Sequence, residues 1–275
     1  MLSRLSRKLT AIILAICGIL FCCWSVSLAT SHQGNDAGLL SAICPIVYPL
    51  DEASAERGYR FIFYGNAFFI DREGYLITAA HVLTDFQDGG QPHILLRLPE
   101  APPRLVKVEL ISADSQHDIA VLRAVPNPFA GRYDVAFLPL ASDKPAQGSA
   151  VLAAALRPAR VKDPRTFDAP QEDKSPAEVL QYTSTRLNKG QGEAEVFLFS
   201  HEVIRGQSGA PILSRDTQAV VGIVEGQWLR GLPLSSATTA GRVGSTLGAG
   251  VPITYALTLL KEKHIPWQTI SGRHP

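Results

Sequence analysis

The chain has 275 residues, of which 46% are hydrophobic and 19% are charged, so it can bury a substantial core and is not a disordered polymer. The 26 lysine and arginine residues nearly balance the 25 aspartate and glutamate residues, and the formal net charge is +1. Binding to nucleic acid by phosphate neutralisation usually needs a clear basic excess, so we expect no nucleic-acid partner. The 22 glycines and 19 prolines are scattered without a period, which excludes collagen-like and low-complexity chains.

The first 29 residues have the three-part pattern of a secretory signal peptide. An apolar run over residues 11–24 is preceded by three cations and followed by small residues up to Ala29, at the spacing that signal peptidase accepts. We therefore expect an exported protein, either periplasmic or secreted. The alternative is an uncleaved membrane anchor facing outside the cytoplasm, because the apolar stretch to Leu28 could reach about 18 residues.

Three of the four cysteines lie inside this leader, so an exported chain would keep only Cys44 and form no internal disulfide. Cys44 lies in an apolar segment, and we expect it to be a small buried side chain rather than a reactive thiol. The cysteine and histidine residues do not cluster at metal-ligand spacing, so the sequence predicts no structural zinc site.

After the leader, residues 30–42 are expected to form a linker and residues 43–270 the folded domain. Short runs rich in β-branched and aromatic residues follow one another, separated by turn residues, at the spacing of an all-β sandwich or barrel. The predicted strands cover residues 60–69, 75–78, 93–98, 105–111, 119–124, 149–155, 194–200, 210–213 and 219–225.

The connections are predicted from their turn-forming and charged residues. Residues 71–74 should form a hairpin turn, in which Gly74 can take a positive φ. Residues 157–176 are rich in charge and proline and should form a long surface loop. Residues 254–263 have a helical pattern that ends in lysines, and the glycine-rich residues 244–250 before them should form a flexible loop.

Three separate motifs contain the residue types that nucleophilic catalysis needs. His81 ends a predicted strand after two small alanines, which leave space around the imidazole of a general base. Asp118 stands at the start of a core strand, where a buried carboxylate needs a donor such as an imidazole N–H. Gly206 and Gly209 flank Ser208 and allow a tight turn that exposes the hydroxyl and gathers backbone N–H groups. Each residue alone is also compatible with a purely structural role.

The order His81, Asp118, Ser208 in a strand-rich chain resembles the trypsin-like serine peptidases. The surrounding sequences are similar to those of the bacterial HtrA-type branch: GNAFFI at residues 65–70, YLIT at residues 75–78 and DIAVL at residues 118–122. The resemblance covers roughly residues 60–260. It implies two six-stranded antiparallel β-barrels with a short C-terminal helix, the first barrel at about residues 43–140 and the second at about residues 141–250.

By this resemblance, the chain would be a serine endopeptidase that cleaves exported or envelope proteins through an acyl-enzyme intermediate. Ser208 would be the nucleophile, His81 the general base and Asp118 the residue that orients the imidazole. The backbone N–H groups of Gly206 and Ser208 would form the oxyanion hole. This reaction needs neither a metal nor an organic cofactor.

The sequence also departs from the family pattern. Ala210 stands where a second glycine is common. Gln207 replaces the aspartate that pairs with a new amino terminus in digestive enzymes, so activation through that ion pair is not expected. HtrA-type proteins usually continue into a PDZ domain, and regulation through such a domain is not expected here. Glu202, which would favour basic side chains, or Val203, which would favour apolar ones, could form the primary substrate pocket.

Two other classes of function are weighed against the peptidase. An α/β-hydrolase esterase would place its acid and base after the serine and would alternate strands with helices, which this sequence does not do. A catalytically silent peptidase-like domain that binds peptides or envelope proteins would keep the same fold. That binding domain remains the alternative, and the sequence does not give the oligomeric state.

Overall fold

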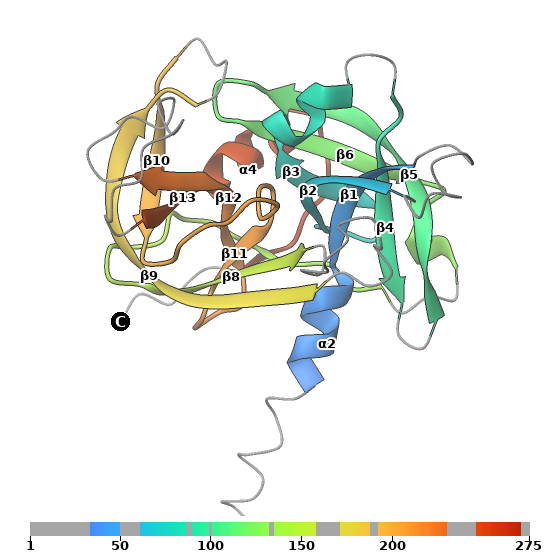
Figure 1. Ribbon diagram of the computed structural model, residues 1–275, viewed down its shortest axis with the longest axis horizontal. Coiled ribbons are helices and arrows are strands. Elements are labelled where there is room, and N and C mark those ends of the chain that lie inside the picture. The colour runs from blue at the N-terminus through green and yellow to red at the C-terminus, as the bar shows by residue number, and fades with distance from the viewer. Residues whose placement is uncertain are drawn as a thin grey trace, which may run out of the picture. The chain divides into compact units, whose positions relative to one another are not determined.

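The computed structural model describes residues 34–49, 61–86, 90–98, 101–131, 135–157, 171–187, 192–229 and 246–270 (Figure 1). The predicted signal peptide or anchor lies outside these residues. Helix α2 (Gly34–Ser41) lies in the segment expected to be a linker, and the chain from Leu39 onward forms one compact unit. No helix in the described part of the chain is both long enough and apolar enough to cross a membrane.

Six antiparallel strands close into the first barrel in the order β1-β2-β3-β6-β5-β4 (Figure 1). The strands are β1 (Ile43–Pro49), β2 (Phe61–Phe69), β3 (Tyr75–Ala79), β4 (His93–Leu98), β5 (Ala101–Asp114) and β6 (Ile119–Val125). The predicted hairpin between β2 and β3 is confirmed, and Gly74 has a φ of 85°. Asp71 Oδ1 accepts the N–H groups of Glu73 and Tyr75, which fixes the turn.

The second barrel contains β8 (Ala150–Arg157), β9 (Gln171–Thr185), β10 (Ala194–Phe199), β11 (Pro211–Ser214), β12 (Val220–Leu229) and β13 (Thr246–Pro252). Its order is β11-β8-β9-β10-β13-β12, and pairing of β12 with β11 closes it. Beyond these six strands, β7 (Leu140–Ala141) pairs in parallel with β12, and β14 (Thr269–Ile270) pairs in parallel with β7. Helix α4 (Ile253–Glu262) follows. The predicted fold of two six-stranded barrels and a short C-terminal helix is therefore confirmed.

Two segments predicted as loops contain strands. The predicted surface loop over residues 157–176 includes the start of β9, which pairs with β8 from Gln171 onward. The predicted flexible loop at residues 244–250 includes most of β13, where Gly250 lies opposite Phe197 on β10. A Cβ on Gly250 would stand 2.6 Å from the Phe197 ring, so the glycine leaves the space that the ring fills.

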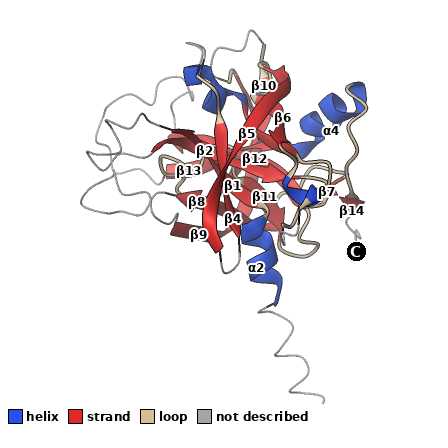
Figure 2. Ribbon diagram, turned by 90° about the vertical axis from the view of Figure 1, so that its right-hand side faces the viewer, coloured by secondary structure: helices blue, strands red, loops and turns tan. Residues whose placement is uncertain are grey.

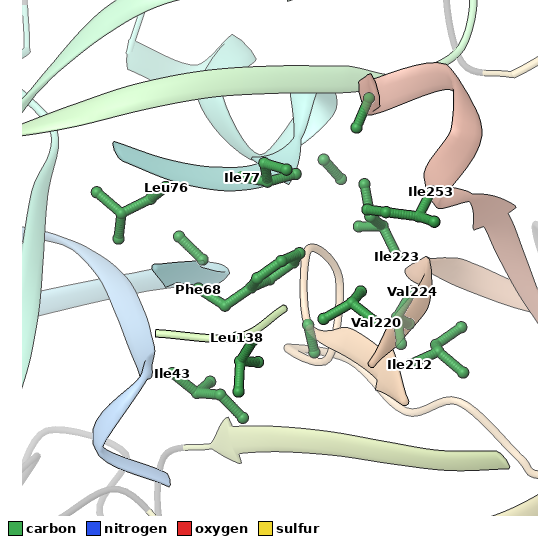
Figure 3. Close-up of a cluster of buried hydrophobic side chains, with 14 of the residues drawn as sticks. Ile43, Phe68, Leu76, Ile77, Leu138, Ile212, Val220, Ile223, Val224 and Ile253 are labelled. Carbon is green, nitrogen blue, oxygen red and sulfur yellow. The ribbon is translucent and has the colours of Figure 1, made fainter. Parts of the chain in front are cut away.

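The two barrels share one continuous hydrophobic core. Figure 3 shows Phe68 of β2 and Ile77 of β3 together with Ile223 and Val224 of β12 and Ile253 of α4, and each of these side chains is at most 1% exposed. Figure 2 shows strands throughout this unit and α4 beside them, and α4 packs against strands of both barrels. This shared core fixes one barrel against the other, so residues from both can form one site. Cys44 is fully buried within it, as predicted.

Candidate active site

The pairing of β3 with β6 brings two distant parts of the chain together. β3 leads directly into the short 3-10 helix η1 (Ala80–Phe86), whose second residue is His81. Ala79 of β3 pairs with Ile119 of β6, and the Ala80 N–H donates to the Asp118 carbonyl at 3.0 Å. Asp118 therefore lies next to His81, although 37 positions separate them in the sequence.

The Asp118 carboxylate binds His81 at two points. His81 Nδ1 lies 2.6 Å from Asp118 Oδ2, and the His81 backbone N–H donates to Oδ1 at 2.8 Å. Because a carboxylate can only accept, Nδ1 carries the hydrogen and Nε2 of the neutral ring is an acceptor. The Asp118 side chain is 3% exposed and that of His81 is 25% exposed, so the carboxylate is buried while the ring reaches solvent. Asp118 has a φ of 55°, a strained backbone conformation typical of functional sites.

Ser208 lies in the loop between β10 and β11, which docks on β12. The Gly209 N–H donates to the Val224 carbonyl at 2.8 Å, and the Ser208 hydroxyl donates to the Glu225 carbonyl at 3.2 Å. Gly206 and Gly209 have φ values of 96° and 79°. The loop takes the tight turn that the sequence predicted, and the hydroxyl is directed at β12.

Asn66 of the first barrel holds the Ser208 loop from the other side. Its backbone N–H donates to the Ser208 carbonyl at 2.8 Å, and its side-chain Nδ2 donates to the Gly206 carbonyl at 2.8 Å. Its Oδ1 accepts the Leu156 N–H of β8 at 2.9 Å, and the residue is fully buried. Asn66 was expected only as part of the GNAFFI sequence that resembles the HtrA-type branch, with no role of its own. The missed signal was an amide inside a buried strand, which must find hydrogen-bond partners.

The Gln207 carbonyl, which shares a peptide unit with the Ser208 N–H, accepts the Ala210 N–H at 3.0 Å, so the orientation of that unit is fixed within the turn. Among the residues that the structure describes, neither the Gly206 N–H nor the Ser208 N–H has a hydrogen-bond acceptor. Two such donors in a turn with positive φ form a concavity that can bind a developing negative charge. The loop thus has the chemistry expected of an oxyanion hole.

The side chain of Gln207, which lies between these two residues, is buried and hydrogen-bonded to other residues of the chain. It is 2% exposed, and its Oε1 accepts the Ile204 N–H at 2.8 Å. Its Nε2 donates to Asp173 of β9 at 2.8 Å, and the same Asp173 oxygen forms an ion pair with Arg157 at 2.6 Å. A neutral amide at this position therefore satisfies its own hydrogen bonds and needs no free amino terminus as a partner.

Glu225 of β12 is a further buried carboxyl group at the site. The register of β12 against β13 shifts between Val224 and Gly226, so Glu225 is the extra residue of a β-bulge. The residue is 7% exposed, and one of its carboxyl oxygens, a ring nitrogen of His81 and a carboxyl oxygen of Asp118 lie within 4.8 Å of one another. Burial and, second, the negative charge of Asp118 raise the pKa of Glu225 to about 7, while His81 opposes this shift.

Glu225 ends the strand predicted over residues 219–225, and no functional role was expected for it. The missed signal was an acidic residue directly after the apolar run of residues 219–224. Glu225, His81 and Asp118 are near enough to one another for a divalent cation, but both Asp118 carboxyl oxygens are already bound by His81, so the group does not fit one.

The two residues considered for the substrate pocket differ in accessibility. Glu202 is exposed, and its Oε1 accepts a long hydrogen bond from Gln227 Nε2 on β12 at 3.4 Å. Val203 is 5% exposed and belongs to the hydrophobic core. The Glu202 side chain is therefore accessible to a ligand beside β12, whereas the Val203 side chain is covered by its neighbours.

The sequence profile of the trypsin-like peptidase domain matches residues 65–223, more than half of the chain. The chain belongs to the trypsin-like peptidase family. This match confirms the family resemblance stated from the sequence. Among curated proteins, no sequence matches this trypsin-like peptidase.

Solved structures of proteases have the same fold as this trypsin-like peptidase. The active form of Rv3671c protease from M. tuberculosis matches with a TM-score of 0.56 and 16% identity, over 84% of this chain and 85% of that one. The MamO protease domain from Magnetospirillum magneticum matches with 0.53 and 15%, over 81% and 97%. The HtrA-type protease AlgW with a tripeptide matches with 0.52 and 17%, over 82% and 61%. At these identities, the likeness shows a common two-barrel fold.

Proposed function

We propose that this trypsin-like peptidase is a serine endopeptidase in which Ser208, His81 and Asp118 act as a catalytic triad. The observation that carries the proposal is the 2.6 Å hydrogen bond between His81 Nδ1 and the buried Asp118 carboxylate. It leaves Nε2 as the basic atom of a ring that reaches solvent. Glu225 connects Ser208 with the His81 region, which supports the proposal. Its backbone carbonyl accepts a hydrogen bond from the Ser208 hydroxyl, and its carboxyl group lies within 4.8 Å of a His81 ring nitrogen.

In the proposed reaction, rotation of the Ser208 side chain turns its hydroxyl from the Glu225 carbonyl toward His81 Nε2. Nε2 accepts the proton as Ser208 Oγ attacks the substrate carbonyl carbon, and Asp118 stabilises the imidazolium that forms. The N–H groups of Gly206 and Ser208 donate to the oxyanion, each contributing about 3 to 4 kcal/mol. The imidazolium then protonates the leaving amine, and water hydrolyses the acyl-enzyme with His81 again as the base.

Glu202 is the proposed determinant of substrate preference. It is exposed beside Gln227 of β12, whereas the surface of Val203 is buried in the core. A carboxylate in this place favours lysine or arginine before the cleaved bond. Mass spectrometry of peptide-library digests should show that preference, and Glu202→Gln should weaken it. An apolar preference that is unchanged in the variant would contradict this role.

The proposed substrates are exported or envelope proteins, and the support for this is the sequence of residues 1–29. Membrane tethering is the alternative to release. Fractionation of cells that express the chain, followed by mass spectrometry of its first residue, tests both. A soluble exported form that begins after Ala29 would indicate a cleaved signal peptide. An intact amino terminus in the membrane fraction would indicate an anchor.

A fluorophosphonate reagent, which labels activated serines, tests the proposed triad. The native chain should be labelled and Ser208→Ala should not. Asp118→Asn should slow peptide hydrolysis by about 10⁴-fold, as loss of the orienting carboxylate does in such triads. The matched control is Ser149→Ala, because Ser149 precedes β8 at the end opposite Leu156, which bonds to Asn66. This control should be labelled like the native chain.

The competing function is a silent peptide-binding domain, and one observation favours it: the Ser208 hydroxyl is engaged by the Glu225 carbonyl. A folded native chain that is neither labelled nor able to cleave a peptide library would support this alternative. Equal labelling of the native chain and Ser208→Ala would indicate another nucleophile. Either result overturns the proposed triad.

A further inference from the structure

The proposed peptidase reaction uses the backbone carbonyl of Glu225 as a resting partner for Ser208 but does not use its side chain. That side chain is 7% exposed, and Oε2 has no hydrogen-bond partner among the described residues. It is directed by the bulge in β12 toward the His81–Asp118 pair, to within 4.8 Å. A buried acidic group without a partner at a reactive site calls for a specific explanation.

The two neighbouring carboxyl groups have unequal hydrogen bonding. Asp118 accepts two hydrogen bonds from His81, one at each carboxyl oxygen. Glu225 Oε2 accepts none among the described residues, and its burial disfavours a charge. When two carboxyl groups lie this close and one proton is available to them, the proton therefore goes to Glu225. A protonated carboxyl group is a hydrogen-bond donor, which a carboxylate is not.

We propose that Glu225 is a protonated positioning residue, whose carboxyl group donates a hydrogen bond to the Asp118 carboxylate, directly or through one water, and so holds the carboxylate that orients His81. The inference rests on the proposed triad and adds a fourth residue to it. Glu225 transfers no proton to the substrate. It acts through Asp118, and the bulge in β12 supplies its orientation.

Among the described residues, His81 and Asp118 are the titratable groups that face Glu225. The flanking strands β11 and β13 contain no ionisable side chain. The ionisable residues of the other adjoining described elements are engaged elsewhere or exposed: Tyr75 of β3 against Arg123, Tyr255 of α4 against His117, Lys261 and Glu262 on the exposed side of α4, and Glu202 and Arg205 in the Ser208 loop. His201 of that loop stacks on Phe199.

Loss of the proton from Glu225 should change the site in two ways. The carboxyl group stops being a donor to Asp118, and the new negative charge favours the protonated, inactive form of the His81 imidazole. Since burial and Asp118 bring the pKa of Glu225 to about 7, both changes fall within the pH range in which a catalytic histidine becomes active. The rising limb of the pH profile should therefore contain two coupled ionisations rather than one.

The pH dependence of kcat/KM for Glu225→Gln tests this coupling. The amide can donate to Asp118 without titrating, so below about pH 7, where Glu225 keeps its proton, kcat/KM should stay within about threefold of the native value. Its rising limb should become a single ionisation, with a midpoint lower by about half a pH unit or more. Glu225→Ala has no donor, and its kcat should fall by about tenfold or more with little change in KM.

The matched control is Asp71→Asn. Asp71 is also 7% exposed and has one carboxyl oxygen without a partner among the described residues, but it lies before β3, at the end opposite His81. Asp71→Asn should leave the midpoint and shape of the rising limb of the kcat/KM pH profile as in the native chain. If Glu225→Gln gives the same midpoint and shape as Asp71→Asn, the positioning role is wrong.

A second measurement does not depend on hydrolysis. Infrared or carbon-13 NMR spectra of the Ser208→Ala chain should show a protonated carboxyl group at about pH 5.5 to 6 that titrates near pH 7. This signal should be missing in the Ser208→Ala, Glu225→Gln double variant. If the signal is missing from the single variant while the native chain reacts with fluorophosphonate, the Glu225 inference is wrong and the triad stands. If the signal is present but Ser208 is never labelled, the peptidase is wrong, and the positioning role falls with it.

Discussion

Gly209→Ala should destabilise the protein strongly, because the glycine lies where the Ser208 loop contacts the first barrel. Its φ is 79°, and an added Cβ would overlap the carbonyl oxygen of Asn66 and the hydroxyl of Thr78. The left-handed conformation alone costs roughly 1 to 2 kcal/mol for an alanine. Overpacking adds roughly 1 to 3 kcal/mol, and a backbone carbonyl cannot rotate away. We therefore expect a loss of about 2 to 5 kcal/mol.

Two other glycines separate these contributions. Gly148 has a φ of 83°, but a Cβ there has no atom within 4 Å, so Gly148→Ala should lose only the roughly 1 to 2 kcal/mol of the backbone conformation. Gly226 on β12 likewise has open space around its Cβ and has no positive φ. Gly226→Ala should therefore change stability by less than about 0.5 kcal/mol.

Urea unfolding followed by tryptophan fluorescence measures these differences. The Ser208→Ala background prevents self-cleavage during the measurement, and the shared core of the two barrels predicts a single transition. In chains that keep Ser208, Gly209→Ala should also lose most of the fluorophosphonate labelling. If Gly209→Ala is no less stable than Gly148→Ala, the Ser208 loop does not pack on Asn66 and Thr78, and the reasoning about the site is refuted.

Asn66→Ala removes the amide that binds the Gly206 carbonyl and leaves a buried Leu156 N–H without its acceptor, so it should lose about 2 to 3 kcal/mol and most of kcat. Asn127→Ala, which loses a more exposed amide, is its control in the same unfolding and kinetic assays. The pKa of Glu225 is raised in the folded state, to about 7 from 4.5, so its contribution to stability is complete below about pH 4.5 and is lost as the pH rises through 7. Unfolding free energies should therefore fall by roughly 3 kcal/mol over that range and stay flatter in Glu225→Gln; equal slopes would contradict the raised pKa. Burial raises the pKa of the Cys44 thiol, so thiol reagents should modify Cys44 only after unfolding, and fast modification of the native chain would show that the β1 region opens.

The sequence pattern predicts the strands whose side chains alternate or form apolar runs, such as residues 75–78 and 119–124. Two strands escape this reasoning for physical reasons. β9 begins with the polar residues 171–175, and the side chains of residues 172–175 are partly or fully exposed, so no apolar pattern marks it. β13 contains glycines, and its burial comes from phenylalanine rings of β10 that occupy the space above them. Its own residues give no sign of this packing.

The candidate site could be predicted in part, because its catalytic residue types stand in recognisable motifs in a known order. The residues that position them could not. Asn66 binds Gly206, 140 positions away in the sequence, and Glu225 lies within 4.8 Å of Asp118, 107 positions away. Neither belongs to a motif with a chemical role of its own. What marks both is a polar side chain within a buried strand, and the sequence alone does not reveal which partner it meets.

The hydrogen bonds of Gln207 determine when the proposed peptidase would become competent. The amide is bound by Ile204 and by Asp173, which itself pairs with Arg157, so the turn around the nucleophile is completed by groups within the uncut polypeptide. The turn would then form as the chain folds, without a new amino terminus as a partner for residue 207.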